Sequence, residues 1–400
     1  MEQSKKEFFI KAGIINLTLI ALIGVLMRYK IGFEFPYFSQ KNLLHAHSHY
    51  AFAGWVTHIL FTLMVIFLRN NVKNKAIYNR LLMANLVCAF GMLISFTLQG
   101  YGAVSITFST LSIFIGYGFT YYYLKDLSNL PDHPSKNWFK AALLFNVLSS
   151  LGTFYLAYMM VTKNINQHAY LGSVYFYLHF QYSGWFFFAI MGLIIDKFLE
   201  LPSFSYDSKL FKTFFVACVP AYFLSILWAN LPWYLYVFPV VAVLLQLWGL
   251  SLLVRKVITH LAQIKISWPK TVQWLLGLAF FALIIKFLLQ AGSVFPEISK
   301  LAFGFRSIVI AYLHLVLLAF TTLFLLGYMF LDKYIRQNKL SNISLIVFSI
   351  GVFANEFVLM IQGVTSFVYI LVPYLNQVLF GVSLIMLFSL ILLVFSYKKS

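Results

Sequence analysis

Apolar runs of about 20 residues recur along the whole chain, separated by short polar stretches. As a helix, a run of that length crosses a bilayer core of roughly 30 Å. Backbone groups in lipid must be satisfied within the protein, which favours helices. A transmembrane barrel would instead show alternating segments of about 10 residues. The pattern therefore predicts an all-α, polytopic membrane protein with about twelve transmembrane helices.

The predicted spans cover residues 8–28, 45–68, 80–100, 102–124, 138–162, 172–195, 211–229, 232–254, 271–291, 303–330, 342–364 and 370–396. No polar stretch between them is long enough to form a separate soluble domain. We therefore expect a single transmembrane helical domain covering residues 1–400.

The Lys and Arg residues test this count of spans. With twelve spans, 22 of them fall on the side of the membrane that holds both termini, and six fall on the other side. Lys286 lies inside the ninth span. Cytoplasmic loops are enriched in Lys and Arg, so both termini are predicted to be cytoplasmic.

Composition agrees with a lipid environment. Hydrophobic residues make up 62% of the chain and charged residues 10%, whereas soluble domains carry about 25% charged residues. The net charge of +18 is explained by topology and by contacts with lipid headgroups, so the bilayer is the expected partner and nucleic acid is not. Cys88 and Cys218 lie within apolar runs and predict no disulfide or thiolate metal site. We expect an integral protein of a bacterial inner (cytoplasmic) membrane.

Six of the nine histidines lie in apolar runs, and these runs are the second, sixth and tenth. The six residues are His45, His47, His49, His58, His179 and His314. The other three, His133, His168 and His260, fall in loops. Because the histidine-bearing spans are four apart, the chain divides into pseudo-repeats of four helices, at roughly 1–130, 131–255 and 256–400.

Ionisable groups at membrane depth are costly and mark functional sites. Imidazole ligates haem iron and copper, can carry protons, and can also bridge neighbouring helices. At 100° per residue, His45 and His49 share one helix face, whereas His47 shares the opposite face with His58. These four side chains cannot all ligate one metal ion, so we expect one ligand with supporting neighbours.

These residues resemble subunit I of the haem–copper oxidases and the related NnrS membrane proteins. On the second span, His47-Ser-His-Tyr-Ala-Phe-Ala-Gly54 is similar to the family segment with a haem-ligating His seven residues before a Gly, and His45-Ala-His47 is similar to the NnrS motif. On the tenth span, His314 is similar to the second His of a family His-x-His, and Tyr312 stands at the first. On the sixth, the segment from His179 to Trp185 is similar to a copper-binding segment.

The chain departs from the family on the seventh span. The stretch from Ala229 to Tyr234 stands where the family has a His-His pair. The resemblance therefore implies a haem–copper oxidase-like bundle with one low-spin haem b on His47 and His314. His179 would be a remnant metal ligand, and copper is not expected. The implied role is electron transfer or the binding or sensing of a diatomic gas, with other respiratory or cytochrome subunits as partners. Whether catalysis remains is left open.

Two alternatives remain. Glu356 lies in the eleventh span beside Asn355, and Lys286 lies in the ninth. With the intramembrane histidines, Glu356 could form the pathway of a proton- or metal-coupled transporter. In the other alternative, the histidines only bridge helices in an assembly or structural protein. In the haem interpretation, His45, His49, His58, Tyr312 and Glu356 have supporting roles.

Overall fold

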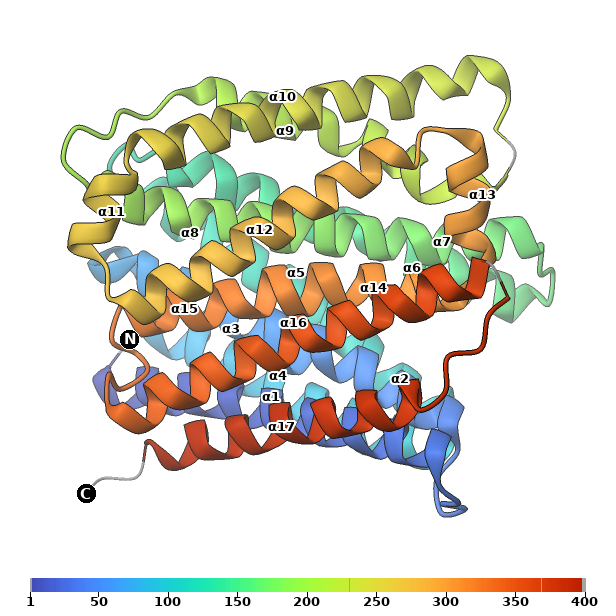
Figure 1. Cartoon of the computed structure of the whole chain (residues 1–400). Helices are drawn as coiled ribbons and strands as arrows, with labels where there is room; N and C mark the ends of the chain where they lie inside the picture. The colour runs from blue at the N-terminus through green and yellow to red at the C-terminus, as the bar shows by residue number, and fades with distance from the viewer. Residues whose placement is uncertain (1, 230, 368, 398–400) are drawn as a thin grey trace. The chain divides into compact units, whose positions relative to one another are not determined.

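The computed structural model describes residues 2–229, 231–367 and 369–397, and within these ranges the regular structure is helical, without strands (Figure 1). Twelve helical segments there are long and apolar enough to cross a membrane. The predicted all-α architecture is therefore confirmed, and so is the presence of twelve helices that could cross a membrane.

The twelve spans are Gln3–Gly32, Gln40–Phe67, Lys75–Gln99, Ala103–Ser128, Ser135–Thr162, Gln167–Leu199, Ser208–Ala229, Trp233–Thr259, Lys270–Gly292, Arg306–Leu331, Lys339–Ser366 and Leu375–Phe395. No predicted end differs from the observed one by more than five residues. Side-chain caps account for several of the starts: the carboxamide oxygen of Asn74, for example, accepts from the backbone N–H groups of Ala76 and Ile77 at 3.1 and 3.2 Å.

The α-helices are α1 (Gln3–Gly32), α2 (Gln40–Tyr50), α3 (His58–Phe67), α4 (Lys75–Gln99), α5 (Ala103–Ser128), α6 (Ser135–Thr162), α7 (Gln167–His179), α8 (Phe187–Leu199), α9 (Ser208–Cys218), α10 (Val237–Thr259), α11 (Leu261–Ser267), α12 (Lys270–Gly292), α13 (Pro296–Gly304), α14 (Arg306–His314), α15 (Leu323–Leu331), α16 (Lys339–Phe367) and α17 (Leu375–Phe395). Three segments are π-helices: η1 (Ala51–Thr57), η3 (Phe180–Phe186) and η6 (Leu315–Thr322). Three are 3-10 helices: η2 (Arg69–Asn71), η4 (Pro220–Ala229) and η5 (Trp233–Tyr236).

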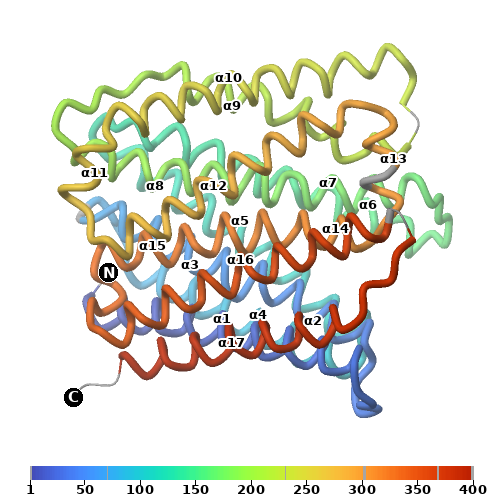
Figure 2. Tube along the Cα trace, viewed as in Figure 1, coloured from blue at the N-terminus to red at the C-terminus, as the bar shows by residue number. Residues whose placement is uncertain are grey.

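The chain forms two compact units. Unit 1 comprises Met1–Pro131, Thr322–Gln362 and Leu371–Ser400, and unit 2 comprises Asp132–Thr321 and Gly363–Ile370. In unit 1 the first helix, α1, packs along the last, α17, as the tube in Figure 2 shows. The rings of Tyr29 and Phe380 lie 5.8 Å apart between their centres at one end of this pair. At the other end, burial and the nearby Glu7 carboxylate raise the pKa of Tyr397. The two helices are therefore antiparallel, as an even number of spans requires.

A tight turn joins α4 to α5 in unit 1. Gly100 adopts a φ of 65°, a left-handed conformation that glycine takes without steric cost. A Cβ at this position would also lie 2.6 Å from Oδ1 of Asn42. Ser105 closes the turn, because its hydroxyl donates to the Gly100 carbonyl at 2.7 Å and accepts from the Gly102 N–H at 2.9 Å. The turn thereby holds Tyr101 beside the start of α2.

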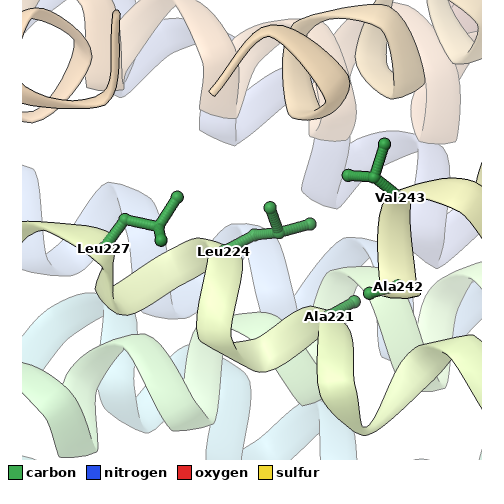
Figure 3. Close-up of a cluster of buried hydrophobic side chains, with 5 residues drawn as sticks. All are labelled: Ala221, Leu224, Leu227, Ala242 and Val243. Carbon is green, nitrogen blue, oxygen red and sulfur yellow. The ribbon is translucent and has the colours of Figure 1, made fainter. Parts of the chain in front are cut away.

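In unit 2, α6 packs against α7 and α8, and α10 packs against α9, η4 and α12. One core of this unit lies where η4 meets α10 (Figure 3). Its buried members are Ala221, Leu224, Leu227, Ala242 and Val243. Alanines at such a contact allow two backbones to approach closely, which is typical of helix packing in membranes.

The predicted topology can be tested by cysteine labelling. Ser128 and Asn164 are exposed at opposite predicted sides of the membrane, whereas native Cys88 and Cys218 are buried. In intact cells, a membrane-impermeant maleimide should label the Asn164→Cys variant and not Ser128→Cys, and both should react after permeabilisation. The reverse pattern would overturn the cytoplasmic placement of the termini.

Candidate functional site

The intramembrane histidines are distributed over both units. His45, His47, His49 and His58 belong to unit 1, and His179 and His314 belong to unit 2.

Two of the unit 1 histidines pack against α1. Nδ1 of His47 lies 3.1 Å from the carbonyl oxygen of Ile20, and Nε2 of His58 lies 3.0 Å from that of Phe9. His58 is fully buried, and His47 is half-buried. Both contacts lie on one helix, in agreement with the common face predicted from the spacing, although η1 lies between the two residues.

The other two histidines of α2, His45 and His49, contact α4 and the turn between α4 and α5. The ring of His49 stacks on Phe96 of α4 at 4.3 Å between centres, and its Nε2 lies 2.9 Å from the hydroxyl oxygen of Tyr101. The ring of His45 meets Tyr101 edge-on at 4.6 Å. Nε2 of His45 is buried and has no hydrogen-bond partner among the described residues. The predicted division of these histidines into two faces is therefore observed.

His179 is fully buried in unit 2. Its Nε2 donates to the carbonyl of Cys218 at 2.8 Å, and its Nδ1 has no hydrogen-bond partner within the described ranges. The rings of Phe180 and Tyr222 lie 5.0 and 6.1 Å from it, between centres. Lys286 of α12 interacts electrostatically with His179 and with Cys218.

His314 ends α14 and is half-buried. Its Nδ1 lies 2.8 Å from the carbonyl oxygen of Ile310, one turn earlier on the same helix. Tyr312, at the position where the resemblance expects another His, contacts Tyr182 instead, with 6.2 Å between ring centres. Tyr312 is therefore part of an aromatic contact in unit 2.

These hydrogen bonds define which nitrogen of each ring holds the proton. A carbonyl oxygen only accepts, so the nitrogen that faces it must carry a hydrogen. In neutral His47 and His314 this is Nδ1, which leaves the lone pair on Nε2. In neutral His58 and His179 it is Nε2. Ligand histidines commonly donate their other N–H to a carbonyl in this way.

Each histidine-bearing span contains a π-helix, and within residues 2–229, 231–367 and 369–397 no other span does. The segment η1 begins two residues after His49, η3 directly after His179, and η6 directly after His314. π-Helices account for well under 1% of residues and often occur at functional sites. The three predicted pseudo-repeats hold one each.

The same three segments share a sequence pattern, in which a His is followed five residues later by a small residue and then by an aromatic one. It occurs at His49, Gly54 and Trp55, at His179, Gly184 and Trp185, and at His314, Ala319 and Phe320. The three histidines are 130 and 135 residues apart. This pattern aligns His49, rather than His47, with the other two. It was visible in the sequence and was missed because the family motif directs attention to His47.

Side chains donate hydrogen bonds to backbone carbonyls of the π-helices η1 and η6. In η1, the amide nitrogen of Asn16 donates to the Gly54 carbonyl at 2.5 Å, and that of Asn85 donates to the Ala53 carbonyl at 3.0 Å. In η6, the hydroxyl of Thr321 donates to the Val316 carbonyl at 2.8 Å. Because buried carbonyls need partners, these side chains stabilise the π geometry.

Two further ionisable groups lie within spans. Lys286 is 2% exposed, and its Nζ donates to Oε1 of Gln290 at 3.2 Å and lies 4.4 Å from the ring centre of Phe287. Glu356 accepts from the side chain of its neighbour Asn355 at 3.2 Å. Neither group has an ion-pair partner among the described residues.

No group of three or more His, Cys, Asp or Glu side chains is placed to hold a metal ion in the part of the chain that the structure describes. The stretch from Ala229 to Tyr234 includes Asn230, which lies outside those residues. Unit 2 also contains an open groove of about 410 Å³ between α6, α7 and η4, lined by aromatic side chains and by His168. His168 lies in the first turn of α7, so its predicted position in a loop is wrong: the helix begins earlier than expected, after the Asn166 cap. None of the six intramembrane histidines lines this groove.

Comparison with known proteins adds no assignment, because no family model matches the chain and no curated protein is similar to it in sequence.

The packing of η3 leads to a matched pair of substitutions. A Cβ on Gly184 would lie 2.6 Å from Cβ of Phe145, whereas a Cβ on Gly277 of α12 would meet nothing within 4 Å. Gly184→Ala should lower the unfolding free energy by about 1–3 kcal/mol through overpacking. Gly277→Ala should raise it by about 0.5–1 kcal/mol. Thermal unfolding in detergent measures both, and an equal response would contradict the close approach of η3 to α6.

Proposed function

We propose that this chain is a haem-binding membrane protein, a divergent relative of haem–copper oxidase subunit I, with His47 and His314 as axial ligands. Its role would be electron transfer within an inner membrane, with both termini in the cytoplasm and respiratory or cytochrome subunits as partners. The observation that supports the proposal most directly is the state of these two rings. In each ring Nδ1–H donates to a backbone carbonyl, of Ile20 for His47 and of Ile310 for His314, as haem-ligating and metal-ligating histidines commonly do.

The surroundings of His47 are compatible with a ligand role. Ile20 fixes the orientation of the ring through its carbonyl oxygen, which also makes the imidazole a stronger donor to iron. Gly24 faces the edge of the ring, where a Cβ would already lie 3.5 Å from Cε1. A larger residue at that position would crowd this edge. On His314, the carbonyl of Ile310 has the orienting role.

A haem held by His47 and His314 would supply one-electron redox chemistry, which favours electron transfer over gas binding. This chain offers fewer candidate ligands for copper than for haem iron. His179 directs Nε2 to the Cys218 carbonyl, so only its Nδ1 is left as a ligand. One imidazole nitrogen is too few for a stable copper site, and we propose none.

Reduced-minus-oxidised spectra of the detergent-purified protein test this proposal. Protein from haem-replete cells should show the sharp bands of a low-spin haem b. His47→Ala and His314→Ala should each abolish these bands, because each removes one axial ligand.

His49→Ala and His260→Ala are the matched controls. His49 lies two residues from His47 on the opposite face, and His260 lies outside the spans, with Nδ1 bonded to the Lys256 carbonyl. Both variants should keep the haem bands. Protein without haem, or bands lost in His49→Ala and kept in His47→Ala, would refute the assignment.

A second candidate function is proton-coupled or metal-coupled transport with Glu356 and the intramembrane histidines. The observation that favours it is that Glu356 and Lys286 lie within spans without an ion-pair partner among the described residues. Such groups often belong to proton pathways.

In this second case, vesicles containing the protein should show proton flux under an imposed potential, and Glu356→Gln should reduce it at least tenfold because the side chain no longer exchanges a proton. A pH-sensitive dye inside the vesicles measures the flux, and Glu297→Gln, a carboxylate outside the twelve spans, is the control. Equal flux in the Glu356→Gln and wild-type proteins would exclude this role.

A further inference from the structure

His45 and His49 form a pair on α2 that the proposed haem does not use. They are four residues apart, so their side chains project from the same face of the helix. Both rings meet the same two aromatic side chains: His45 lies 6.3 Å from Phe96 and 4.6 Å from Tyr101, and His49 lies 4.3 and 5.7 Å from them, between ring centres. Two imidazoles on one helix face with this spacing are a known arrangement for binding zinc.

Tyr101 adds an oxygen to this pair from another part of unit 1. It stands in the Gly100–Gly102 turn, which is fixed by the left-handed Gly100 and by Ser105. Its hydroxyl oxygen lies 2.9 Å from Nε2 of His49. Two ligand atoms that each lie about 2.0–2.1 Å from one metal ion are roughly 2.9–3.4 Å apart for angles between 90° and 109°. The observed separation falls at the lower end of that range.

The ring of His45 has a nitrogen left for a ligand. Its Nε2 is buried and has no hydrogen-bond partner among the described residues, which is costly for a polar atom. A metal ion in contact with this atom would remove that cost. The cation that acts on His45 is Lys41, which is exposed, so solvent screens its repulsion of a bound metal.

We propose that His45, His49 and Tyr101 bind a borderline divalent cation such as Zn²⁺ at the predicted outer end of the second span. Imidazole and phenol oxygen are suitable ligands for Zn²⁺ and Cu²⁺, and not for Mg²⁺ or Ca²⁺. The ion would connect α2 to the turn between α4 and α5. It would lie on the opposite face of α2 from His47, separate from the haem ligand.

Calorimetric titration of the detergent-purified wild-type protein with zinc chloride tests the site. We expect one equivalent of Zn²⁺ to bind and Mg²⁺ not to compete. His45→Ala and His49→Ala should each weaken Zn²⁺ binding at least tenfold, and Tyr101→Phe should weaken it less. With Cu²⁺ as a spectroscopic probe, electron paramagnetic resonance should show two coordinated nitrogens in the wild-type protein and one in His45→Ala.

His168→Ala and His47→Ala are the controls, and both should bind Zn²⁺ as the wild-type protein does. Unchanged Zn²⁺ affinity in His45→Ala and His49→Ala would overturn the proposal, and so would an equal loss in His168→Ala. The haem bands are recorded on the same samples. Loss of haem in His47→Ala with Zn²⁺ binding retained separates the two sites, so either proposal can fail alone.

A measurement on the wild-type protein avoids variants that fail to fold. Diethyl pyrocarbonate modifies accessible imidazoles, and mass spectrometry identifies the modified residues. Zn²⁺ should protect His45 and His49 at least fivefold and leave the modification of His168 unchanged. Equal modification of His45 and His49 with and without Zn²⁺ would overturn the site.

Discussion

Every backbone amide and carbonyl in a long apolar helix must find its hydrogen-bond partner inside the protein, and this constraint organises the whole chain. A regular α-helix pairs these groups through its own backbone hydrogen bonds, and most of the spans are built that way. The histidine-bearing spans depart from regular α-helical bonding at the π-helices η1, η3 and η6. There, side chains such as Asn16, Asn85 and Thr321 donate to carbonyls of the π-helices. Side chains around the histidines therefore satisfy backbone carbonyls, a structural role that is independent of any ligand.

The same constraint determines what the histidines themselves do. Buried imidazoles need partners, and His47, His58, His179 and His314 each face a backbone carbonyl. For His47, His58 and His179 the bond joins two elements distant in the sequence, whereas the bond of His314 stays within α14. For His47 and His314, the bonded nitrogen leaves Nε2 as the lone-pair atom. The carbonyl that each ring meets therefore determines which of its two nitrogens is the lone-pair atom.

The twelve spans could be predicted because hydropathy and the Lys and Arg distribution are local properties of the sequence. The two faces of α2 could be predicted because the 100° step holds from His45 to His49. The π-helices could not be predicted in the same way, since they depend on tertiary contacts such as Phe145 against Gly184 and Asn16 on Gly54. Tyr101 was missed because it lies in a turn, whose conformation rests on Gly100 and Ser105 and not on periodicity.

The repeated pattern sharpens the choice between His47 and His49. If the three repeats descend from one unit, His49, His179 and His314 are its equivalent histidines, and His47 is an addition in the first repeat. Equivalent positions do not have equivalent surroundings here: His49 faces Tyr101, His179 faces the Cys218 carbonyl, and His314 faces its own helix. In the first repeat, the Ile20 carbonyl faces Nδ1 of His47 and orients that ring. The nitrogen that carries the lone pair therefore depends on the partner that each ring meets, and an alignment of the repeats does not show that partner.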